Sequence, residues 1–297
     1  MEWVYKYCKA NNIPFKVVYF ALEESFDFFW TTILLDKFKD LTGRSLTYYQ
    51  YKGYHIGMTE EDRIKIQEIL PEIEDMKKYI IVYDSVSNPT GLLRTVEKEL
   101  QGVGRIVKGE TITDQYGNDI TKKEFIYNDE NFHLVVVADH IGLLSTEENK
   151  HAIVSDLRQS ISKWSEYVIS LLCKRYNAIV VSVHQQEMAG ENNDNFKLGR
   201  LEPSETKLGD NKIVGRDYMV TIGLFNPIKY NLSNYLDYNV RDFEDHFRTV
   251  HVLKHRNGIA GIVKAMWFDG VGNKFTELPK AKSPELITFI NKIKTNV

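Results

Sequence analysis

The sequence predicts an α/β fold, a mainly parallel β-sheet flanked by helices, and three observations predict it. Short apolar runs rich in β-branched and aromatic residues occur at 15–20, 79–83, 134–138 and 178–183, which is typical of strands buried on both faces. Longer stretches with apolar residues three and four positions apart separate these runs, as in helices. Strand and helix alternate up to Val183, which is the order of parallel strands joined by helical crossovers.

Residue patterns typical of helix amino termini indicate where the expected helices begin. The segments TEED at 59–62 and STEE at 145–148 both have the pattern of a capping box, so a helix is expected to begin at each. Asn88-Pro89 opens another helix, because proline is favoured in a first helical turn. The expected helices cover 1–10, 26–41, 59–78, 88–100 and 145–175.

The remaining strands have the alternating pattern of antiparallel sheets. Residues 104–127 alternate around the turn YGND at 116–119, which predicts an inserted surface β-hairpin. Near the carboxyl terminus, a strand at 218–224 precedes a pair at 249–253 and 262–268, and the turn of this pair contains Asn257-Gly258. The sequence therefore predicts antiparallel strands after the parallel sheet. Residues 1–297 are expected to form one large domain, with 104–127 as the insertion.

Composition excludes several classes of protein. The chain has 38 basic and 41 acidic residues and a net charge of −3, so it offers no general basic footprint for nucleic acid or membrane. Two cysteines, Cys8 and Cys173, cannot form a disulfide framework, and no signal peptide or apolar span of about twenty residues occurs. We expect a soluble protein of a reducing cytoplasm that does not bind membranes.

Polar residues follow the predicted parallel strands directly. Glu23 and Glu24, Asp84, Asp139 and Gln185 each come at or just after the end of an apolar run. The carboxyl ends of parallel strands meet at one edge, which is where open α/β sheets bind ligands. An aspartate there can hold Mg²⁺ beside a phosphate, because this cation prefers oxygen ligands. The alternative is an Asp139 that only caps a loop or the following helix.

Four segments, taken in order, carry a resemblance. FALEES, VVVADHIGLL, VVSVHQQ and VLKHRNGIAGIVKAMWF together resemble the ATPase domain of DnaB-type replicative helicases, which are hexameric motors with a RecA-like P-loop NTPase core. The resemblance runs from about Lys16 to Leu278. It implies ATP and Mg²⁺ as cofactors.

The resemblance also implies roles for individual residues. Glu23 matches the glutamate that polarises the water attacking the γ-phosphate, and Glu24 is expected to point away. Asp139 matches the Walker B aspartate, which holds Mg²⁺. The alternative for Glu23 is an acid that caps a helix.

Three further residues match the family pattern. Gln185 matches the γ-phosphate sensor, whose amide can report the phosphate to the loop that follows. Lys254 and Arg256 match the pair that a neighbouring subunit inserts toward the nucleotide. The alternative for Gln185 is a polar residue that only fills the end of a strand. The alternative for Lys254 and Arg256 is a basic, solvated tip of a hairpin. His184 is expected to be structural.

Two departures from the family pattern stand out. The phosphate-binding loop GxxxxGK[ST] is absent from the sequence, whose first glycine is Gly43. We expect the chain to be the downstream part of a split or truncated gene product, and the alternative is a degenerate subunit that binds nucleotide poorly. The segment KLGDNKIVGRD at 207–217 lacks the Glu-Gln of the family. Lys197, Arg200 and Lys207 could still contact phosphates of single-stranded DNA.

The sequence supports a first hypothesis and two alternatives. The first is an ATP-driven 5′ to 3′ DNA helicase of phage type, a homo-oligomeric ring, expected to be hexameric, in the host cytoplasm. It would translocate on single-stranded DNA, with primase or a helicase loader as further partners. One alternative is a recombinase-like or clock-type RecA relative that acts on DNA or protein. The other is a non-enzymatic assembly subunit that supplies Arg256 to an active neighbour.

Overall fold

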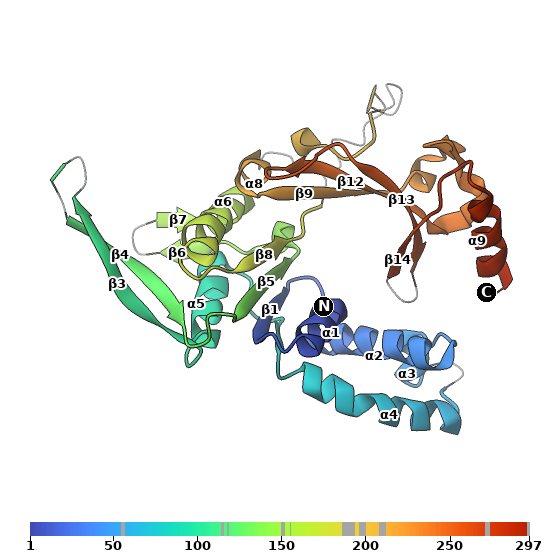
Figure 1. Ribbon diagram of the computed structural model, residues 1–297, viewed down its shortest axis with the longest axis horizontal. Helices are drawn as coiled ribbons and strands as arrows, with labels where there is room; N and C mark the ends of the chain where they lie inside the picture. Colours follow the sequence, from blue (N-terminus) through green and yellow to red (C-terminus); the bar gives the residue numbers. More distant parts are fainter. Residues whose placement is uncertain are drawn as a thin grey trace. The chain divides into compact units, whose positions relative to one another are not determined.

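The structure is a computed structural model that describes residues 1–54, 57–113, 116–117, 119–149, 152–154, 156–185, 194–195, 200–207, 212–270 and 274–295. The chain divides into two compact units (Figure 1). The first unit comprises 1–37 and 58–185, and the second comprises 38–57 and 186–297. Each unit is described by itself below.

A four-stranded parallel sheet forms the centre of the first unit. Its order is β2 (Ile80–Tyr83), β1 (Phe15–Ala21), β5 (His133–Asp139) and β8 (Ile179–Ser182). The two central strands, β1 and β5, are almost entirely buried. The predicted mainly parallel sheet is therefore confirmed, with strand boundaries within one residue of those expected.

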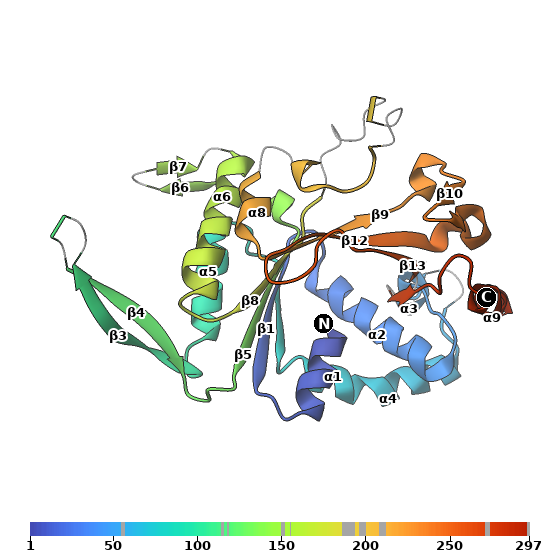
Figure 2. The same ribbon diagram turned by 45° about the horizontal axis from the view of Figure 1, so that its top comes forward.

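Helices cover both faces of this sheet (Figure 2). One face carries α1 (Glu2–Ala10), α2 (Phe26–Thr42) and α4 (Glu60–Met76), and the other carries α5 (Pro89–Glu99) and α6 (Leu157–Tyr167). On the first face the ring of Tyr19 packs 4.6 Å from that of Phe29. On the second, Trp164 Nε1 donates a 3.0 Å hydrogen bond to Ser182 Oγ.

One of the two predicted capping boxes is confirmed and the other is wrong. Thr59 caps α4 reciprocally with Asp62. At 145–148, by contrast, the chain enters a short antiparallel pair, β6 (Glu147–Asn149) with β7 (Ala152–Val154), and α6 begins only after Asp156. The reason is tertiary: the Glu147 carboxylate accepts hydrogen bonds from Thr90 N and Oγ1, both 2.7 Å long, and binds Lys163. After α6 the chain continues as a π-helical segment, η2 (Val168–Cys173).

The prediction that residues 178–183 are a buried strand is wrong in its burial. Ile179, Val181 and Val183 are 56%, 45% and 41% exposed. Their neighbours in register on β5, Val135 and Val137, are only 7% and 3% exposed. The sequence pattern does not reveal this difference, because an edge strand and a central strand can have the same run of apolar residues.

The predicted hairpin is confirmed. β3 (Gly104–Thr113) pairs antiparallel with β4 (Asp119–Tyr127) and projects from the body of the first unit (Figure 1). Its base is fixed by a 2.5 Å hydrogen bond from the hydroxyl of Tyr127 to the carbonyl oxygen of Tyr176.

The second unit contains the predicted antiparallel strands. Their order is β14 (Lys274–Glu277), β13 (Val263–Asp269), β12 (Phe247–His255) and β9 (Val220–Phe225). Tyr238, Val240, Phe243 and Phe247 form the centre of its hydrophobic core. The shorter elements are α3 (Tyr48–Tyr51), η4 (Glu205–Lys207), α8 (Lys212–Asp217), η5 (Ile228–Tyr230), β10 (Asn234–Tyr235), β11 (Tyr238–Asn239), η6 (Val240–His246) and α9 (Pro284–Thr295), besides η1 (Ile141–Leu143) in the first unit.

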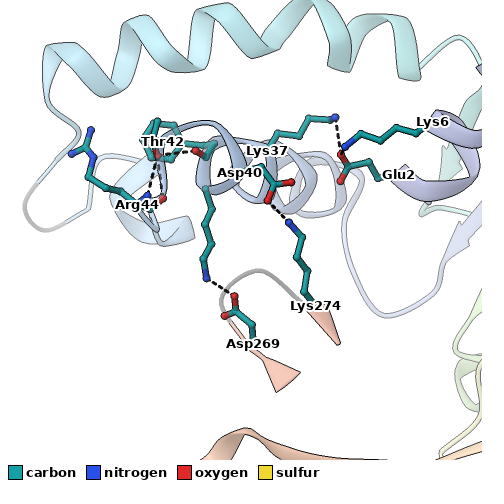
Figure 3. Close-up of polar contacts among 10 residues, drawn as sticks. Glu2, Lys6, Lys37, Asp40, Thr42, Arg44, Asp269 and Lys274 are labelled. Atoms are coloured by element: carbon teal, nitrogen blue, oxygen red, sulfur yellow. Dashed lines mark hydrogen bonds and ion pairs between the residues drawn. The ribbon is translucent and has the colours of Figure 1, made fainter. Parts of the chain in front are cut away.

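Helix α2 begins in the first unit and ends in the second, because the boundary falls after Lys37. Within the first unit, the buried ammonium of Lys37 binds Glu2 at 2.9 Å and Glu72 at 2.6 Å. Within the second unit, Lys274 binds Asp40 at 2.5 Å, as Figure 3 shows. Lys39 binds Asp269 in the same unit. These ion pairs anchor both halves of the helix.

No helix in the described part of the chain combines the length and the apolar character that crossing a bilayer requires.

Candidate functional site

The parallel sheet brings four of its strand ends to one edge. Reading across the sheet, this edge carries Asp84 after β2, Glu23 and Glu24 after β1, Asp139 at the end of β5, and Gln185 after β8. Ala21 is in register with Asp139, and neighbouring strands lie about 4.8 Å apart. The predicted convergence of the first-unit residues on this edge therefore follows from the pairing.

Asp139 is held in place by a residue that the sequence did not single out. Tyr19, two residues before the end of β1, donates a 2.6 Å hydrogen bond from its hydroxyl to Asp139 Oδ2. Burial and this bond to a carboxylate raise the pKa of Tyr19 above its ordinary value. The hydroxyl therefore remains a donor, and the position of the carboxylate is fixed before any ligand arrives.

The Glu23–Glu24 pair differs from the expectation in one respect. Partial burial and then the negative charges of Asp139 and Glu23 raise the pKa of Glu24. Glu24 is therefore close enough to Asp139 for the two to repel each other, although it was expected to point away. Leu22, just before the pair, donates its backbone N–H to the carbonyl oxygen of Asp139 at 2.6 Å, which ties this bend to β5. Both glutamates lie in the segment that directly follows β1 at this edge.

The remaining acid of the edge, Asp84, has a structural role. Asp84 Oδ2 accepts a 2.8 Å hydrogen bond from the backbone N–H of Phe26, at the start of α2. A carboxylate there satisfies an unpaired helical donor and interacts favourably with the helix dipole. Asp84 therefore orients α2.

Gln185 follows a segment that is bonded to the end of β5. The backbone N–H of Val183 donates to Ala138 O at 3.0 Å, and its carbonyl accepts from Ile141 N at 2.9 Å. The ring of His184 contacts the carbonyl oxygen of Gln185 at 2.6 Å. The side chain of Gln185 is exposed, and its strand, β8, lies on the opposite side of β5 from β1.

Lys254 and Arg256 lie in the second unit and have other partners there. Lys254 Nζ donates to the carbonyl oxygens of Gly215 and Arg216, and Arg256 Nη2 also donates to Arg216 O. These carbonyls belong to the carboxyl-terminal end of α8, where the helix dipole attracts cations. Lys254 lies within β12, opposite Thr221 of β9, and Arg256 directly follows this strand.

A hollow of about 540 Å³ lies elsewhere in the second unit. Its lining consists of Asn195, Arg200, Glu202, Pro203, Ser204, Thr206 and Lys207. Two candidates for DNA phosphates, Arg200 and Lys207, therefore line one hollow, although Lys207 Nζ also donates to Arg200 O and to Glu202 O. Lys197, the third candidate, lies outside the described residues.

The residues that the structure describes contain no group of three or more histidine, cysteine or acidic side chains with the geometry of a metal site. Mg²⁺ in nucleotide sites commonly has one or two protein carboxylates and completes its shell with water and phosphate. Asp139, partly exposed and oriented through one oxygen, fits that requirement as a single carboxylate ligand.

The fold resembles that of DnaB-type ATPase domains, as two solved structures show. The chain is similar to one solved ATPase domain with a TM-score of 0.63 and 13% identity, over 91% of this chain and 76% of that one. It is similar to a DnaB-like replicative helicase studied with primase, with a TM-score of 0.61 and 13% identity over 91% of this chain and 53% of that one. The chain thus spans about half the length of the second protein. At this identity the likeness shows the fold alone.

No family model and no curated protein matches the sequence. The resemblance to DnaB-type ATPase domains is nevertheless confirmed at the level of the fold.

Proposed function

We propose that the chain is a subunit of an ATP-driven DNA helicase, and that ATP binds against the carboxyl edge of the parallel sheet. The observation that carries the proposal is the arrangement around Asp139. Tyr19 fixes its carboxylate, Glu23 and Glu24 follow on the neighbouring strand, and Gln185 follows on the other side. Acids and an amide that meet at this edge of a RecA-like sheet suit phosphoryl transfer.

Each residue has a task in this proposal. Asp139 would hold Mg²⁺, which would supply the positive charge that neutralises the phosphate oxygens. Glu23 accepts the proton of the attacking water, and Glu24 is a second candidate because of its position next to Asp139. Gln185 donates its amide to the γ-phosphate. A neighbouring subunit's copies of Lys254 and Arg256 stabilise the charge of the transition state, as an arginine supplied in trans does.

The proposed assembly is a homo-oligomeric ring, hexameric by analogy, that translocates on single-stranded DNA in the cytoplasm, or in the host cytoplasm for a viral protein. Arg200 and Lys207 are the described candidates for phosphate contacts. Primase or a loader is a further proposed partner, since one of the two similar structures concerns interactions with primase.

One observation favours a second candidate function. The sequence contains no GxxxxGK[ST] loop, and such a loop normally supplies the backbone amides and the lysine that bind the phosphates. The chain would then be an assembly subunit that supplies Lys254 and Arg256 to an active neighbour and does not itself turn over ATP.

Phosphate release from ATP and unwinding of a forked DNA duplex test the proposal. Glu23→Gln should lower turnover by about 10²–10⁴-fold, the usual contribution of a general base, and should spare nucleotide binding. Glu24→Gln, measured in parallel, decides which acid is the base. Glu68→Gln, in an exposed ion pair of α4, is the matched control. A wild-type chain that neither binds nor hydrolyses ATP in any assembly contradicts the proposal.

The role of Arg256 is tested in mixed assemblies. Arg256→Ala subunits, mixed with wild-type subunits, should lower turnover only at the interfaces to which they contribute the arginine. Mixtures that keep full activity at every ratio would exclude this role.

A further inference from the structure

The segment between α2 and α4 has an unusual composition. Residues 41–57 contain Arg44 and Lys52 but no aspartate or glutamate, although the whole chain has a net charge of −3. Four of the 17 tyrosines of the chain lie within residues 48–54. These tyrosines, which we call the tyrosine platform, are Tyr48, Tyr49, Tyr51 and Tyr54. Aromatic residues interleaved with basic ones are typical of surfaces that bind single-stranded nucleic acid.

The short helix α3, which carries most of the platform, is capped at both ends. At its start Thr47 Oγ1 accepts a 3.2 Å hydrogen bond from Gln50 N, and Gln50 Oε1 accepts a 2.9 Å bond from Thr47 N. At its end Gly53 has a left-handed φ of +82°, and Tyr54 N donates to Tyr49 O at 2.8 Å. Because a helix of one turn is not stable by itself, these caps fix the backbone that carries the platform.

Two rings of the platform are accessible to a ligand. Tyr49 and Tyr54 are each 61% exposed, and their ring centroids lie 6.3 Å apart at an interplanar angle of 70°. The ring of Tyr48 lies 6.0 Å from that of Tyr49 at an angle of 85°. Edge-to-face contacts of this kind orient the rings, and a tyrosine has only two χ angles to fix on binding. The platform is therefore preorganised, which lowers the entropic cost of binding.

Positive charge lies next to these rings. Lys52 Nζ lies 5.5 Å from the ring centroid of Tyr48 and 5.8 Å from that of Tyr51. Arg44, whose guanidinium lies 5.9 Å from the ring of Phe38, is exposed. The aromatic rings alone would also suit an apolar peptide. The segment has cations and no carboxylate, however, and this charge favours a polyanion.

We infer that the tyrosine platform binds single-stranded nucleic acid. Bases stack on the exposed rings of Tyr49 and Tyr54, and Lys52 contacts a phosphate of the same strand. The strand is single because the faces of the bases in a duplex are already stacked on their neighbours. This contact is separate from the hollow lined by Arg200 and Lys207. It rests on the platform alone and requires neither ATP nor the proposed function.

Fluorescence anisotropy of a labelled oligothymidine, with the full chain and without ATP, tests the inference. Tyr49→Leu and Tyr54→Leu should each weaken binding about 5- to 150-fold, the usual contribution of one stacked base. Tyr49→Phe should bind like the wild type, because phenylalanine keeps the ring on which a base stacks. Tyr116→Leu, at an 80% exposed tyrosine of the first unit, is the matched control and should change nothing. Urea unfolding like that of the wild type verifies that the leucine variants fold.

The contact of Lys52 is tested by the dependence of binding on salt. Each phosphate contact on a single strand contributes about 0.7 to the slope of log K against log salt concentration. Lys52→Gln should therefore reduce the slope by about 0.7, and Lys65→Gln, in the exposed pair with Glu68, should not change it. An unchanged slope for Lys52→Gln overturns the inference, and so does a Tyr49→Phe variant that binds as weakly as Tyr49→Leu.

The choice of probe distinguishes the possible partners. An oligouridine that binds as tightly as the oligothymidine identifies single-stranded nucleic acid in general, whereas weaker binding identifies DNA, and both results support the inference. A duplex that binds as tightly as the single strand overturns it. A wild type that binds neither oligonucleotide also overturns it and leaves a protein as the partner of the platform.

The possible results also separate the inference from the proposed function. Weaker binding by Tyr49→Leu, in a chain whose wild type neither binds nor hydrolyses ATP in any assembly, supports the inference and contradicts the proposed function. ATP hydrolysis and unwinding by the wild type, together with unchanged DNA binding by Tyr49→Leu and Tyr54→Leu, supports the proposed function and overturns the inference.

Discussion

Tyr19 determines where the most important carboxylate of the edge lies. Its ring packs on Phe29 inside the first unit, and its hydroxyl binds Asp139. Burial of the ring thus fixes the direction of a polar group at the sheet edge, so that Asp139 is oriented by the hydrophobic core. A site arranged in this way is preorganised, which reduces the ordering that ligand binding must cause.

Tyr19→Phe tests this coupling. The variant keeps the ring packing and removes a hydrogen bond to a charged group, which contributes about 1.5–3 kcal/mol; we expect the lower value because Asp139 is partly exposed. Because the pKa of Tyr19 is raised, this contribution is present below pH 10 and is lost as pH rises through the pKa of the folded state. Urea unfolding at pH 7 measures it. Tyr7→Phe, at an exposed tyrosine, should cause no change, and equal effects of both variants would contradict the coupling.

At the residue scale, the sequence predicted the positions of the acids but not their partners. Glu23 and Asp139 could be assigned to strand ends because the apolar runs end clearly. The proximity of Glu24 to Asp139 could not be predicted, because it depends on the bend at 22–24 that Leu22 fixes by its bond to Asp139 O. Tyr19 was also missed, since a tyrosine in an apolar strand is more often simply part of the core.

At the scale of elements, similar local patterns gave different structures. The TEED segment at 59–62 forms a capping box, and the STEE segment at 145–148 leads into a strand. The difference is that the Glu147 carboxylate binds Thr90 and Lys163, which are distant in sequence. Tertiary partners of this kind override a local helix signal, so the start of α6 could not be predicted from the sequence.

Glu147→Gln should reveal the strength of these contacts. Although burial raises the pKa of Glu147, the bonds from Lys163 and Thr90 outweigh it and hold the pKa below its ordinary 4.5. A lowered pKa gives stability that is present above pH 4.5 and lost as pH falls through the pKa of the folded state. We expect the variant to lose about 2 kcal/mol at pH 7 and to approach the wild type once the pH is below the pKa of the folded state. Glu68→Gln, at the exposed Lys65–Glu68 pair, should change stability by less than about 1 kcal/mol. A loss that is independent of pH would exclude this explanation.

Lys254 should stabilise the end of α8 whether or not it acts on a neighbour's nucleotide. Lys254→Met removes the donor to the carbonyls of Gly215 and Arg216. The backbone N–H of Tyr218 donates to the carbonyl oxygen of Val214 at 3.2 Å. We expect the amide of Tyr218 to exchange a few-fold faster in the variant, which corresponds to a loss of about 0.3–1 kcal/mol. Lys264→Met on the neighbouring β13, where the lysine pairs with Glu277 in solvent, is the control. Unchanged exchange at Tyr218 would show that these contacts contribute nothing.

At the scale of the whole molecule, the alternation of strand and helix in the sequence was sufficient to predict the fold class. The observed order of the parallel strands then confirmed this prediction. The position of the sheet's edge was not predictable, because residues 178–183 have the composition of a central strand. Whether residues 1–297 form one domain stays a prediction. The two compact units share helix α2, and the boundary between them falls between Lys37 and Phe38. Both residues are buried, with 5% and 0% of their surfaces exposed.

Continuity of α2 leads to a prediction about cooperativity. Lys37 is tied to Glu2 and Glu72 in the first unit, and Asp40 is tied to Lys274 in the second. Neither unit can unfold completely without disrupting a helix that the other needs, so we expect a single global transition. The slowest amides of β5 and β12 should therefore show the same dependence on urea in native-state hydrogen exchange. The β3–β4 hairpin, which is a two-stranded sheet of its own, should exchange at lower urea and serves as the control. If β12 exchanges at clearly lower urea than β5, the two units are separate domains and the single-domain prediction fails.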